Sequence, residues 1–299
     1  MEVYLASPRG FCAGVVRAVD VVELVLKQAG APVYVRHQIV HNPYVVRSLE
    51  DKGAVTVEDL DDVPRDSVVV FSAHGSPPED YAKAKERGLR VIDATCPLVT
   101  KVHNEAKKYS EQGRKVILVG HRDHAEVRGT MGQAPMALVD DREEFELPDW
   151  KDETPVAVLT QTTLSVDDTQ KASEAISERF PNAIIRNDLC YATTNRQAAV
   201  KQLAKHVDMV LVIGSRSSSN CNRLREVAEG YGLPAYMING PEELDPQWLE
   251  GIERVGITSG ASTPEILEER VIQALKPARV VVLPGPQEDV KFTLPKELR

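Results

Sequence analysis

Three of the four cysteines occur at equivalent places along the chain. Cys12, Cys96 and Cys190 each follow a short apolar run typical of a strand and precede a stretch with helical periodicity. The fourth, Cys221, has a different setting directly after Asn220, and no two cysteines form a Cys-x-x-Cys pair. Three thiolates on three separate segments suit a metal centre that keeps one position open. On residue type alone, both zinc and an iron–sulfur cluster fit such a site.

A polar motif follows each of these cysteines after the next predicted strand. The motifs lie 29, 28 and 28 residues beyond the cysteine, at His41, His124 and Ser218. A third polar loop comes one strand later, at residues 72–75, 160–163 and 259–262. Counted to His74, Thr162 and Ser262, these loops lie 62, 66 and 72 residues after the cysteine. We interpret the chain as three divergent copies of one α/β unit of roughly 90 residues.

The expected division of the chain follows from this repeat. We place the first unit at residues 1–95, the second at 96–188 and the third at 189–283, and we expect the tail at 284–299 to pack on the first unit. Strands are predicted near residues 3–6, 33–36, 68–71, 90–92, 116–119, 156–159, 184–185, 209–213, 255–257 and 280–283. Helices are predicted near residues 15–28, 98–112, 166–179, 194–206, 222–231 and 264–275.

This alternation predicts an α/β fold with mostly parallel sheets. The cysteines and polar loops would all lie at the carboxyl ends of the strands, where ligands bind in open α/β sheets. If the three units surround a pseudo-threefold axis with those edges inward, the cysteines and polar loops converge on one centre.

The polar loops indicate an anionic ligand. Ser and Thr at strand-to-helix turns cap helices, while the backbone N–H groups there favour phosphate. Simple N-capping explains any one loop, but six loops in register with three cysteines favour a compact dianion held by neutral donors. Neither a Walker motif nor Gly-x-Gly-x-x-Gly is present, so a nucleotide is not the expected ligand. The candidate donors are His41, His74, His124, Ser218, Asn220 and Ser262.

Glu126 is the candidate proton donor. It lies two residues after His124, and beside a metal and Thr162 it would be placed for general acid chemistry. The alternative for a Glu at a helix start is a solvated residue that suits the helix dipole. His121 and His124, three residues apart, could instead be metal ligands on one helical turn, but the intervening Arg-Asp pair favours a loop.

The composition excludes several other classes of protein. With 36 Lys and Arg against 45 Asp and Glu, the net charge is −9, which argues against non-specific nucleic-acid binding. No apolar run approaches the roughly 20 residues of a membrane helix. The first residues lack a basic segment followed by an apolar core, so we expect a cytoplasmic protein without a signal peptide, in which disulfides are disfavoured.

Seven motifs together resemble one family, that of the 4-hydroxy-3-methylbut-2-enyl diphosphate reductases (IspH/LytB). The motifs are PRGFCAG at residues 8–14, YVRHQIVHN at 34–42, FSAHG at 71–75, DATCPLVTKVH at 93–103, GTMGQ at 129–133, TQTTLSVDD at 160–168 and CYATTNR at 190–196. The resemblance extends from residue 1 to residue 299. It implies a fold of three similar α/β units around a central iron–sulfur cluster.

The resemblance also implies an activity and its cofactor. A 4Fe-4S cluster would be held by Cys12, Cys96 and Cys190, with the fourth iron open to the substrate hydroxyl. Two electrons, from ferredoxin or flavodoxin, and two protons would remove that hydroxyl as water. The products would be isopentenyl and dimethylallyl diphosphates, in the last step of the non-mevalonate isoprenoid pathway.

The roles of the polar residues follow from the same resemblance. Glu126 would supply protons, and Thr162 would hold the hydroxyl and relay a proton, with Thr163 as a neighbouring candidate. The diphosphate would be held by His41, His74, His124, Ser218, Ser219, Asn220 and Ser262, of which His124 also belongs to the catalytic set with Glu126 and Thr162.

One residue departs from the family pattern, because Cys221 stands where a small hydroxyl residue is expected. We expect it to be a thiol that binds no metal. Two other functions remain open on the residues alone: a zinc-dependent hydrolase or lyase acting on a small phosphorylated substrate, with Glu126 as base, and a non-catalytic phosphate-binding protein in which Glu126 is dispensable.

Overall fold

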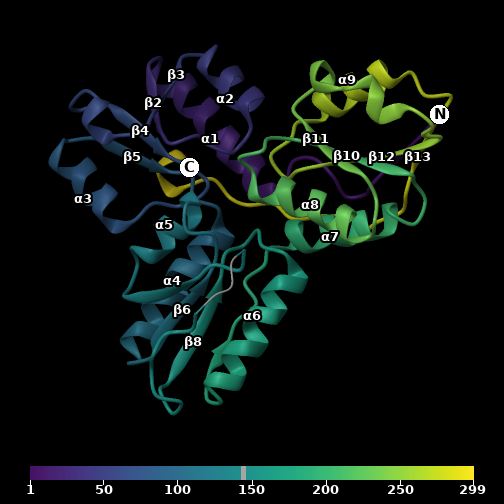
Figure 1. The fold of residues 1–299 in the computed structure, drawn as a ribbon. Coiled ribbons are helices and arrows are strands. Elements are labelled where there is room, and N and C mark those ends of the chain that lie inside the picture. Colours follow the sequence, from purple (N-terminus) through teal and green to yellow (C-terminus); the bar gives the residue numbers. More distant parts are fainter. Residues whose placement is uncertain (143–145) are drawn as a thin grey trace. The chain divides into compact units, whose positions relative to one another are not determined.

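The structure, a computed structural model, describes residues 1–142 and 146–299. It divides into two compact units (Figure 1). Unit 1 consists of Met1–Val15, His41–Val45 and Tyr191–Lys291, and unit 2 of Val16–Val40, Val46–Cys190 and Phe292–Arg299. Unit 1 contains one sheet and unit 2 contains two, and the strand pairs within all three are parallel. The predicted α/β fold with mostly parallel sheets is therefore confirmed.

The sheet of unit 1 has the strand order β11-β10-β12-β1-β13. Its strands are β1 (Glu2–Leu5), β10 (Met209–Ile213), β11 (Ala235–Ile238), β12 (Arg254–Ser259) and β13 (Arg279–Val282). Alternate residues along a strand face opposite sides of a sheet. Val210 and Val212 pack against α7 (Tyr191–Leu203) and α8 (Ser219–Gly230), whereas Leu211 and Ile213 pack against α9 (Glu265–Leu275). Both faces of the sheet are thus covered by helices.

The first sheet of unit 2 has the order β3-β2-β4-β5. It is formed by β2 (Val33–Arg36), β3 (Ala54–Val57), β4 (Val68–Phe71) and β5 (Arg90–Asp93). The helices of this part of the chain are α1 (Ala13–Ala29), α2 (Pro43–Glu50) and α3 (Pro78–Glu86). Val69 and Phe71 are fully buried against Ala84 of α3 and Leu60 of the 3-10 helix η1 (Leu60–Asp62).

The second sheet of unit 2 has the order β7-β6-β8-β9. Its strands are β6 (Lys115–Val119), β7 (Met136–Val139), β8 (Val156–Thr160) and β9 (Ile184–Ile185), and its helices are α4 (Pro97–Glu111), α5 (Ala125–Met131) and α6 (Val166–Arg179). Val116 and Leu118 face α4 and α5, while Ile117 and Val119 face α6. Every residue of β8 is buried, and all but its last residue, Thr160, are apolar, as expected for the centre of a parallel sheet.

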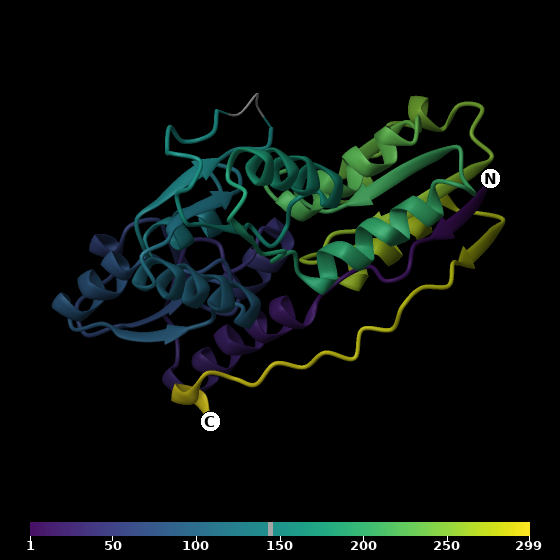
Figure 2. The same ribbon diagram turned by 90° about the horizontal axis from the view of Figure 1, so that it is seen from below.

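Strand β1 does not pair with its neighbours in sequence. It lies between β12 and β13, with Val3 opposite Val255 and Val280, although it belongs to the first of the three predicted copies. After β13 the chain has no helix or strand until η4 (Lys296–Leu298), and it runs as an extended segment (Figure 2). Within unit 2, the Nε of Arg17 donates to the carbonyl of Thr293 at 2.8 Å. The proposed boundaries at residues 95, 188 and 283 stay a prediction.

Two further 3-10 helices, η2 (Pro241–Glu243) and η3 (Pro246–Leu249), lie between β11 and β12. Among the helices in the described ranges, none is both long enough and apolar enough to cross a membrane.

Candidate active site

Glu126 and Thr162 form a buried hydrogen-bonded pair in unit 2. The Thr162 amide donates to Oε1 of Glu126 at 2.6 Å, and the Thr162 hydroxyl donates to Oε2 at 2.9 Å. Glu126 is 3% exposed and Thr162 is 4% exposed. A carboxylate in such a position would normally be paired with a cation. Here the two donors to the carboxyl group, the amide and the hydroxyl of Thr162, are neutral.

Burial raises the pKa of Glu126 to about 7, and the two hydrogen bonds from Thr162 only partly oppose the rise. Removal from water disfavours the charged form of a carboxyl group. A carboxyl group with a pKa near neutrality can hold a proton and release it under physiological conditions, which is what general acid catalysis requires.

The element that positions Glu126 is the turn between β6 and α5. Gly120 ends the strand in close contact with the helix, since a Cβ there would lie 2.7 Å from a methyl group of Val127. His124 is the N-cap of α5, and its Nδ1 accepts a hydrogen bond from the Glu126 amide at 3.2 Å. Helix α5 therefore begins at Ala125 and places Glu126 in its first turn, pointing towards the end of β8.

Thr162 lies just beyond β8 and also contacts a predicted metal ligand. The amide of Cys190 donates to the Thr162 carbonyl at 3.0 Å. The adjacent Gln161 joins two loops, because its side chain accepts from the His121 amide at 3.0 Å and donates to the Thr163 hydroxyl at 2.8 Å. Gln161 was not among the predicted site residues, although it lies between two of the threonines in the motif at residues 160–163.

His74 and His124 lie side by side in unit 2. Their rings are in a T-shaped contact with centroids 5.9 Å apart, and the Nδ1 of His74 lies 3.3 Å from the hydroxyl of Ser72. The turn after His74 requires glycine, because Gly75 has a φ of +82° and a Cβ there would lie 2.6 Å from the ring of His103. The structure thus brings together two of the predicted diphosphate ligands.

Cys96 lies in the loop next to that of His74. Its amide donates to the carbonyl of Ala73 at 3.0 Å, and its own carbonyl accepts from Thr100 at 2.9 Å in the first turn of α4. Pro97 occupies the first position of this helix, where the missing N–H has no intrahelical partner to lose. Cys96 is therefore the N-cap residue of α4 and is partly exposed.

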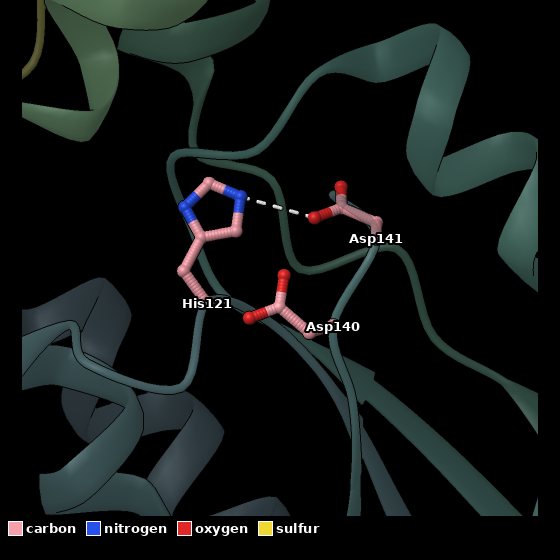
Figure 3. A group of neighbouring side chains, drawn as sticks. All are labelled: His121, Asp140 and Asp141. Carbon is pink, nitrogen blue, oxygen red and sulfur yellow. Dashed lines mark ion pairs between the residues drawn. The ribbon is translucent and has the colours of Figure 1, made fainter. Parts of the chain in front are cut away.

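His121 does not share a helical turn with His124. It precedes α5, and its Nε2 lies 3.0 Å from Oδ1 of Asp141, at ion-pair distance (Figure 3). Ligand atoms of His121, Asp140 and Asp141 lie within 4.8 Å of one another. Asp140, however, already accepts from the guanidinium of Arg142 at 2.9 and 2.6 Å. The alternative in which His121 and His124 bind one metal ion is therefore not supported.

In unit 1, three predicted site loops meet at Ala261. The Ala261 amide donates to Oδ1 of Asn220 at 3.0 Å, and the Ala261 carbonyl accepts from the amide of Cys12 at 3.1 Å. The hydroxyl of Ser262 donates to the carbonyl of His41 at 3.2 Å. Residues from four separate segments thus lie together at the carboxyl edge of the unit 1 sheet, as the spacing predicted.

The loop after β10 ends in the N-terminus of α8. Ser218 is the N-cap, and its hydroxyl accepts from the amide of Cys221 at 3.4 Å. Ser219 and Asn220 are buried in the first turn of the helix. The Nδ2 of Asn220 is buried and has no hydrogen-bond partner within residues 1–142 and 146–299. This donor is therefore available to a ligand at a helix N-terminus, where anions are favoured.

Cys221 is fully buried, and burial raises its pKa to about 11. Its sulfur fills the space beside two glycines, since a Cβ at Gly214 or Gly260 would approach it to 2.4 or 2.1 Å. Cys12, Cys96 and Cys190 are partly exposed by contrast. These properties agree with the expectation that Cys221 binds no metal.

The site residues are thus distributed over the two units. Unit 2 contains His74, Cys96, His124, Glu126, Thr162, Thr163 and Cys190, and unit 1 contains Cys12, His41, Ser218, Ser219, Asn220 and Ser262. Within each unit they lie on loops or in the first turns of helices; Glu126 is in the first turn of α5, and Ser219 and Asn220 are in the first turn of α8.

These features define an α/β protein of parallel sheets with thiols, hydroxyl groups and one protonatable carboxyl group at the strand ends. The family model described as LytB protein matches residues 3–276, and the chain belongs to this family. The resemblance found in the sequence motifs is confirmed.

Relatives match the chain over its full length. It is 53% identical to 4-hydroxy-3-methylbut-2-enyl diphosphate reductase 1 of Rhodopseudomonas palustris, over 99% of both sequences. It is 54% identical to 4-hydroxy-3-methylbut-2-enyl diphosphate reductase 2 of Bradyrhizobium diazoefficiens, over 100% of this chain and 99% of the relative. The solved structure of the corresponding diphosphate reductase of Plasmodium falciparum matches with a TM-score of 0.94 at 37% identity, covering 99% of this chain and 96% of that one.

Proposed function

We propose that this chain is a 4-hydroxy-3-methylbut-2-enyl diphosphate reductase of the non-mevalonate isoprenoid pathway. It removes the allylic hydroxyl group of its substrate as water, using two electrons and two protons, and forms isopentenyl and dimethylallyl diphosphates. The full-length relatives carry the name of this activity. The observation in the structure that supports it best is the buried Glu126–Thr162 pair, a proton donor with a pKa near 7.

We propose Cys12, Cys96 and Cys190 as the ligands of a 4Fe-4S cluster. The donor set fits, because each of the three cysteines directly precedes a helix, at the starts of α1, α4 and α7. The positive end of a helix favours a thiolate, which is the form that binds iron. When bound, the cluster supplies the two electrons and a Lewis-acidic iron for the hydroxyl oxygen.

The proton path is carried by the protein. In the structure the Thr162 hydroxyl donates to Oε2 of Glu126; protonation of Oε2 reverses this hydrogen bond, so that Glu126 donates to the Thr162 oxygen and the hydrogen of Thr162 passes to the substrate hydroxyl. The C–O bond breaks as that oxygen gains its second hydrogen and leaves as water. The two electrons pass to the allyl unit that remains, and the second proton adds to one of its two ends, which gives isopentenyl or dimethylallyl diphosphate. His124 contributes a further donor: its Nδ1 accepts from the Glu126 amide, so in the neutral ring the hydrogen is on Nε2.

The diphosphate is held by neutral donors at the strand ends. We assign this role to His41, His74, His124, Ser218, Ser219, Asn220 and Ser262, with Thr162 and Thr163 nearer the hydroxyl end. The buried Nδ2 of Asn220 and the N-terminus of α8 support the assignment. Binding energy from the diphosphate orients the reacting end of the substrate, so that remote contacts contribute to the rate.

The electron donor that we propose is a ferredoxin or a flavodoxin, and the location is the cytoplasm. Both parts of the proposal rest on the family resemblance.

The test begins with protein purified without oxygen. Iron, acid-labile sulfide and the visible spectrum are measured, and about four irons and four sulfides per chain with broad absorption near ~400 nm are expected. Turnover of the hydroxylated diphosphate is then measured with a reduced donor. A colourless protein with stoichiometric zinc would instead support the zinc hydrolase or lyase, which the names of the relatives do not favour.

A further inference from the structure

The loop that carries Cys12 is fixed at Gly10 from two sides. The Gly10 amide donates to the hydroxyl of Ser259 at 2.7 Å, and the Gly10 carbonyl accepts from Nη2 of Arg196 at 2.7 Å. Gly10 has a φ of +71°, and a Cβ there would lie 3.3 Å from Oε1 of Glu268. The backbone conformation at this position therefore favours glycine, and a Cβ there would require the side chain of Glu268 to shift.

The Arg196 side of this contact is a buried ion pair. Its side chain is 0% exposed, and Nη1 donates to the two carboxylate oxygens of Glu288 at 2.9 and 3.1 Å. Asn195 adds a third hydrogen bond to Glu288, at 3.1 Å. A guanidinium without a countercharge is strongly destabilising in such a position. Glu288, from the extended segment after β13, is therefore required if Arg196 is to hold Gly10.

Ser259, which accepts from the Gly10 amide, is itself hydrogen-bonded to a second ion pair, Glu268 with Arg9. The Ser259 hydroxyl donates to Oε1 of Glu268, and the Nε of Arg9 donates to Oε2 of Glu268 at 2.6 Å. Arg9 also binds the carbonyl of Ala6 at 3.1 Å, so it bridges the end of β1 and α9. Two acids from different segments, the buried Glu268 and the partly exposed Glu288, thus act through their partners on one residue, Gly10, two positions before Cys12.

Side-chain packing alone does not hold this loop. A cavity of about 790 Å³ lies along it, with walls that include Pro8, Arg9, Phe11, Glu268, Gln287 and Glu288. A loop with a cavity on one side has fewer van der Waals contacts to restrain it. The hydrogen bonds to Gly10 therefore replace packing as the restraint.

We propose that Arg196 with Glu288, and Ser259 with Glu268 and Arg9, are positioning residues that hold the Cys12 loop for cluster binding. None of them contacts the reacting atoms in this scheme; they act through Gly10. Hydrogen-bonded neighbours of metal ligands typically contribute 10- to 100-fold to metal affinity. The inference rests on the proposed function, because Cys12 is taken as a cluster ligand.

The first experiment needs no cluster. In metal-free protein, the alkylation rate of each cysteine is measured by mass spectrometry of its peptide. Glu288→Gln removes the charge opposite Arg196, and Arg196→Lys keeps the charge but cannot reach Gly10 and Glu288 together. Both should raise the alkylation rate of Cys12 by about 10-fold, if the equilibrium constant for local opening of the loop rises tenfold. Asp289→Asn, at the exposed neighbouring position, is the matched control and should change nothing.

Cys221 is the internal reference in that experiment. It is buried in unit 1 and should stay protected in every variant. Faster labelling of Cys12 alone indicates a loosened loop. A parallel rise at Cys221 would show general unfolding of the unit, and the positioning role would then be withdrawn.

The second experiment uses the protein with its cluster. Iron transfer to a chelator should be about 10- to 100-fold faster in Glu288→Gln and Arg196→Lys than in Asp289→Asn. If the unmodified protein holds iron and neither variant changes chelation or Cys12 labelling, the inference fails and the proposed function stands. If the unmodified protein binds no iron under anaerobic reconstitution, the proposed function fails, and the network's role in cluster binding fails with it.

Discussion

Two buried glutamates, Glu126 in unit 2 and Glu268 in unit 1, differ in the groups that donate hydrogen bonds to them. Each is 3% exposed. Among the described residues, Glu126 accepts hydrogen bonds from the amide and hydroxyl of Thr162 alone, whereas Glu268 accepts from the guanidinium of Arg9 as well as from the hydroxyl of Ser259. Burial disfavours the charge of Glu126, and in residues 1–142 and 146–299 no cation forms an ion pair with it. Glu268, at the same depth, forms an ion pair with Arg9. Equal burial therefore comes with neutral donors at one glutamate and with a cation at the other.

Asp140 shows the same contrast within unit 2. Burial opposes its ionisation, but hydrogen bonds from Arg142 and from the Arg122 amide outweigh that effect and hold the pKa of Asp140 well below its usual range. The neighbours of a carboxyl group, rather than its depth, decide whether it exchanges protons at neutral pH.

The largest expected effect is the loss of the proposed cluster, which both regions would have to support. Cys12→Ser in unit 1, and Cys96→Ser or Cys190→Ser in unit 2, should each lose cluster iron and turnover, because a hydroxyl group is a poor iron–sulfur ligand. Cys221→Ser is the matched control and should retain both. The check is iron and sulfide per chain after anaerobic reconstitution. Full iron content in any of the first three variants would reassign the ligands.

The next largest effect separates the two glutamates directly. Glu126→Gln should lower kcat by about 10²-fold or more, because the amide cannot donate a proton in the reaction. Cluster content and diphosphate binding should stay near normal. Glu268→Gln should do the reverse and lose iron faster while its pH–rate profile is unchanged. Glu111→Gln, an exposed residue of α4, serves as the control. Near-normal turnover of Glu126→Gln would remove that residue from the mechanism.

Much of the fold could be predicted because local patterns specify it. The spacing of the cysteines gave the repeated strand–loop–helix order, and the predicted ranges of β2, β4 and β10 agree with the structure. Edge strands β3, β7 and β11 were not predicted, whereas the edge strands β5, β9 and β13, which are no longer than these, were. Each of the three that were not predicted contains an alanine among its four residues, and alanine is depleted in strands. Helices α7 and α8 begin three residues earlier than predicted. The residues of the motifs after Cys190 and Ser218 were expected to form loops, but they form the first turns of these helices.

The candidate site could be predicted only in part, for a related reason. Cys12, Glu126 and Thr162 lie in recognisable motifs, but the pair Arg196–Glu288 joins residues 92 positions apart that share no local pattern. The burial of Arg196 likewise cannot be predicted from the sequence of α7, in which most of the other residues are small or polar. Such tertiary contacts depend on the path of the segment after β13, and this path cannot be predicted from a helical or strand pattern because the segment forms neither element before η4.

A smaller effect is expected in the pH dependence of the unfolding free energy, to which Glu126 should contribute. The pKa of Glu126 is raised from its ordinary 4.5 to about 7, so folding favours the protonated form. The associated stability is fully present below about pH 4.5 and is lost as the pH rises through about 7. Relative to Glu126→Gln, the unmodified protein should therefore lose about 2 kcal/mol of unfolding free energy between about pH 5 and about pH 8.

Urea unfolding of the metal-free protein measures that difference, so that cluster loss does not enter. Glu111→Gln should show no comparable change with pH, because its carboxyl group is exposed in both states. A constant difference between the Glu126 variant and the unmodified protein across this range would mean that Glu126 is ionised in the folded state, and the contrast with Glu268 would disappear.

The smallest effect concerns the N-terminus of α8, where capping and ligand binding are the two available roles of Ser218. Ser218→Ala removes the hydroxyl that accepts from the Cys221 amide and should lower the unfolding free energy by about 1 kcal/mol. Ser165→Ala, at the N-cap of α6, removes an equivalent cap in unit 2 and should lower it by a similar amount. Only Ser218→Ala should also raise KM for the diphosphate substrate, because Ser165 belongs to no proposed ligand set. Equal KM values in the two variants would leave Ser218 as a cap alone and restrict the diphosphate donors of unit 1 to Ser219, Asn220, Ser262 and His41.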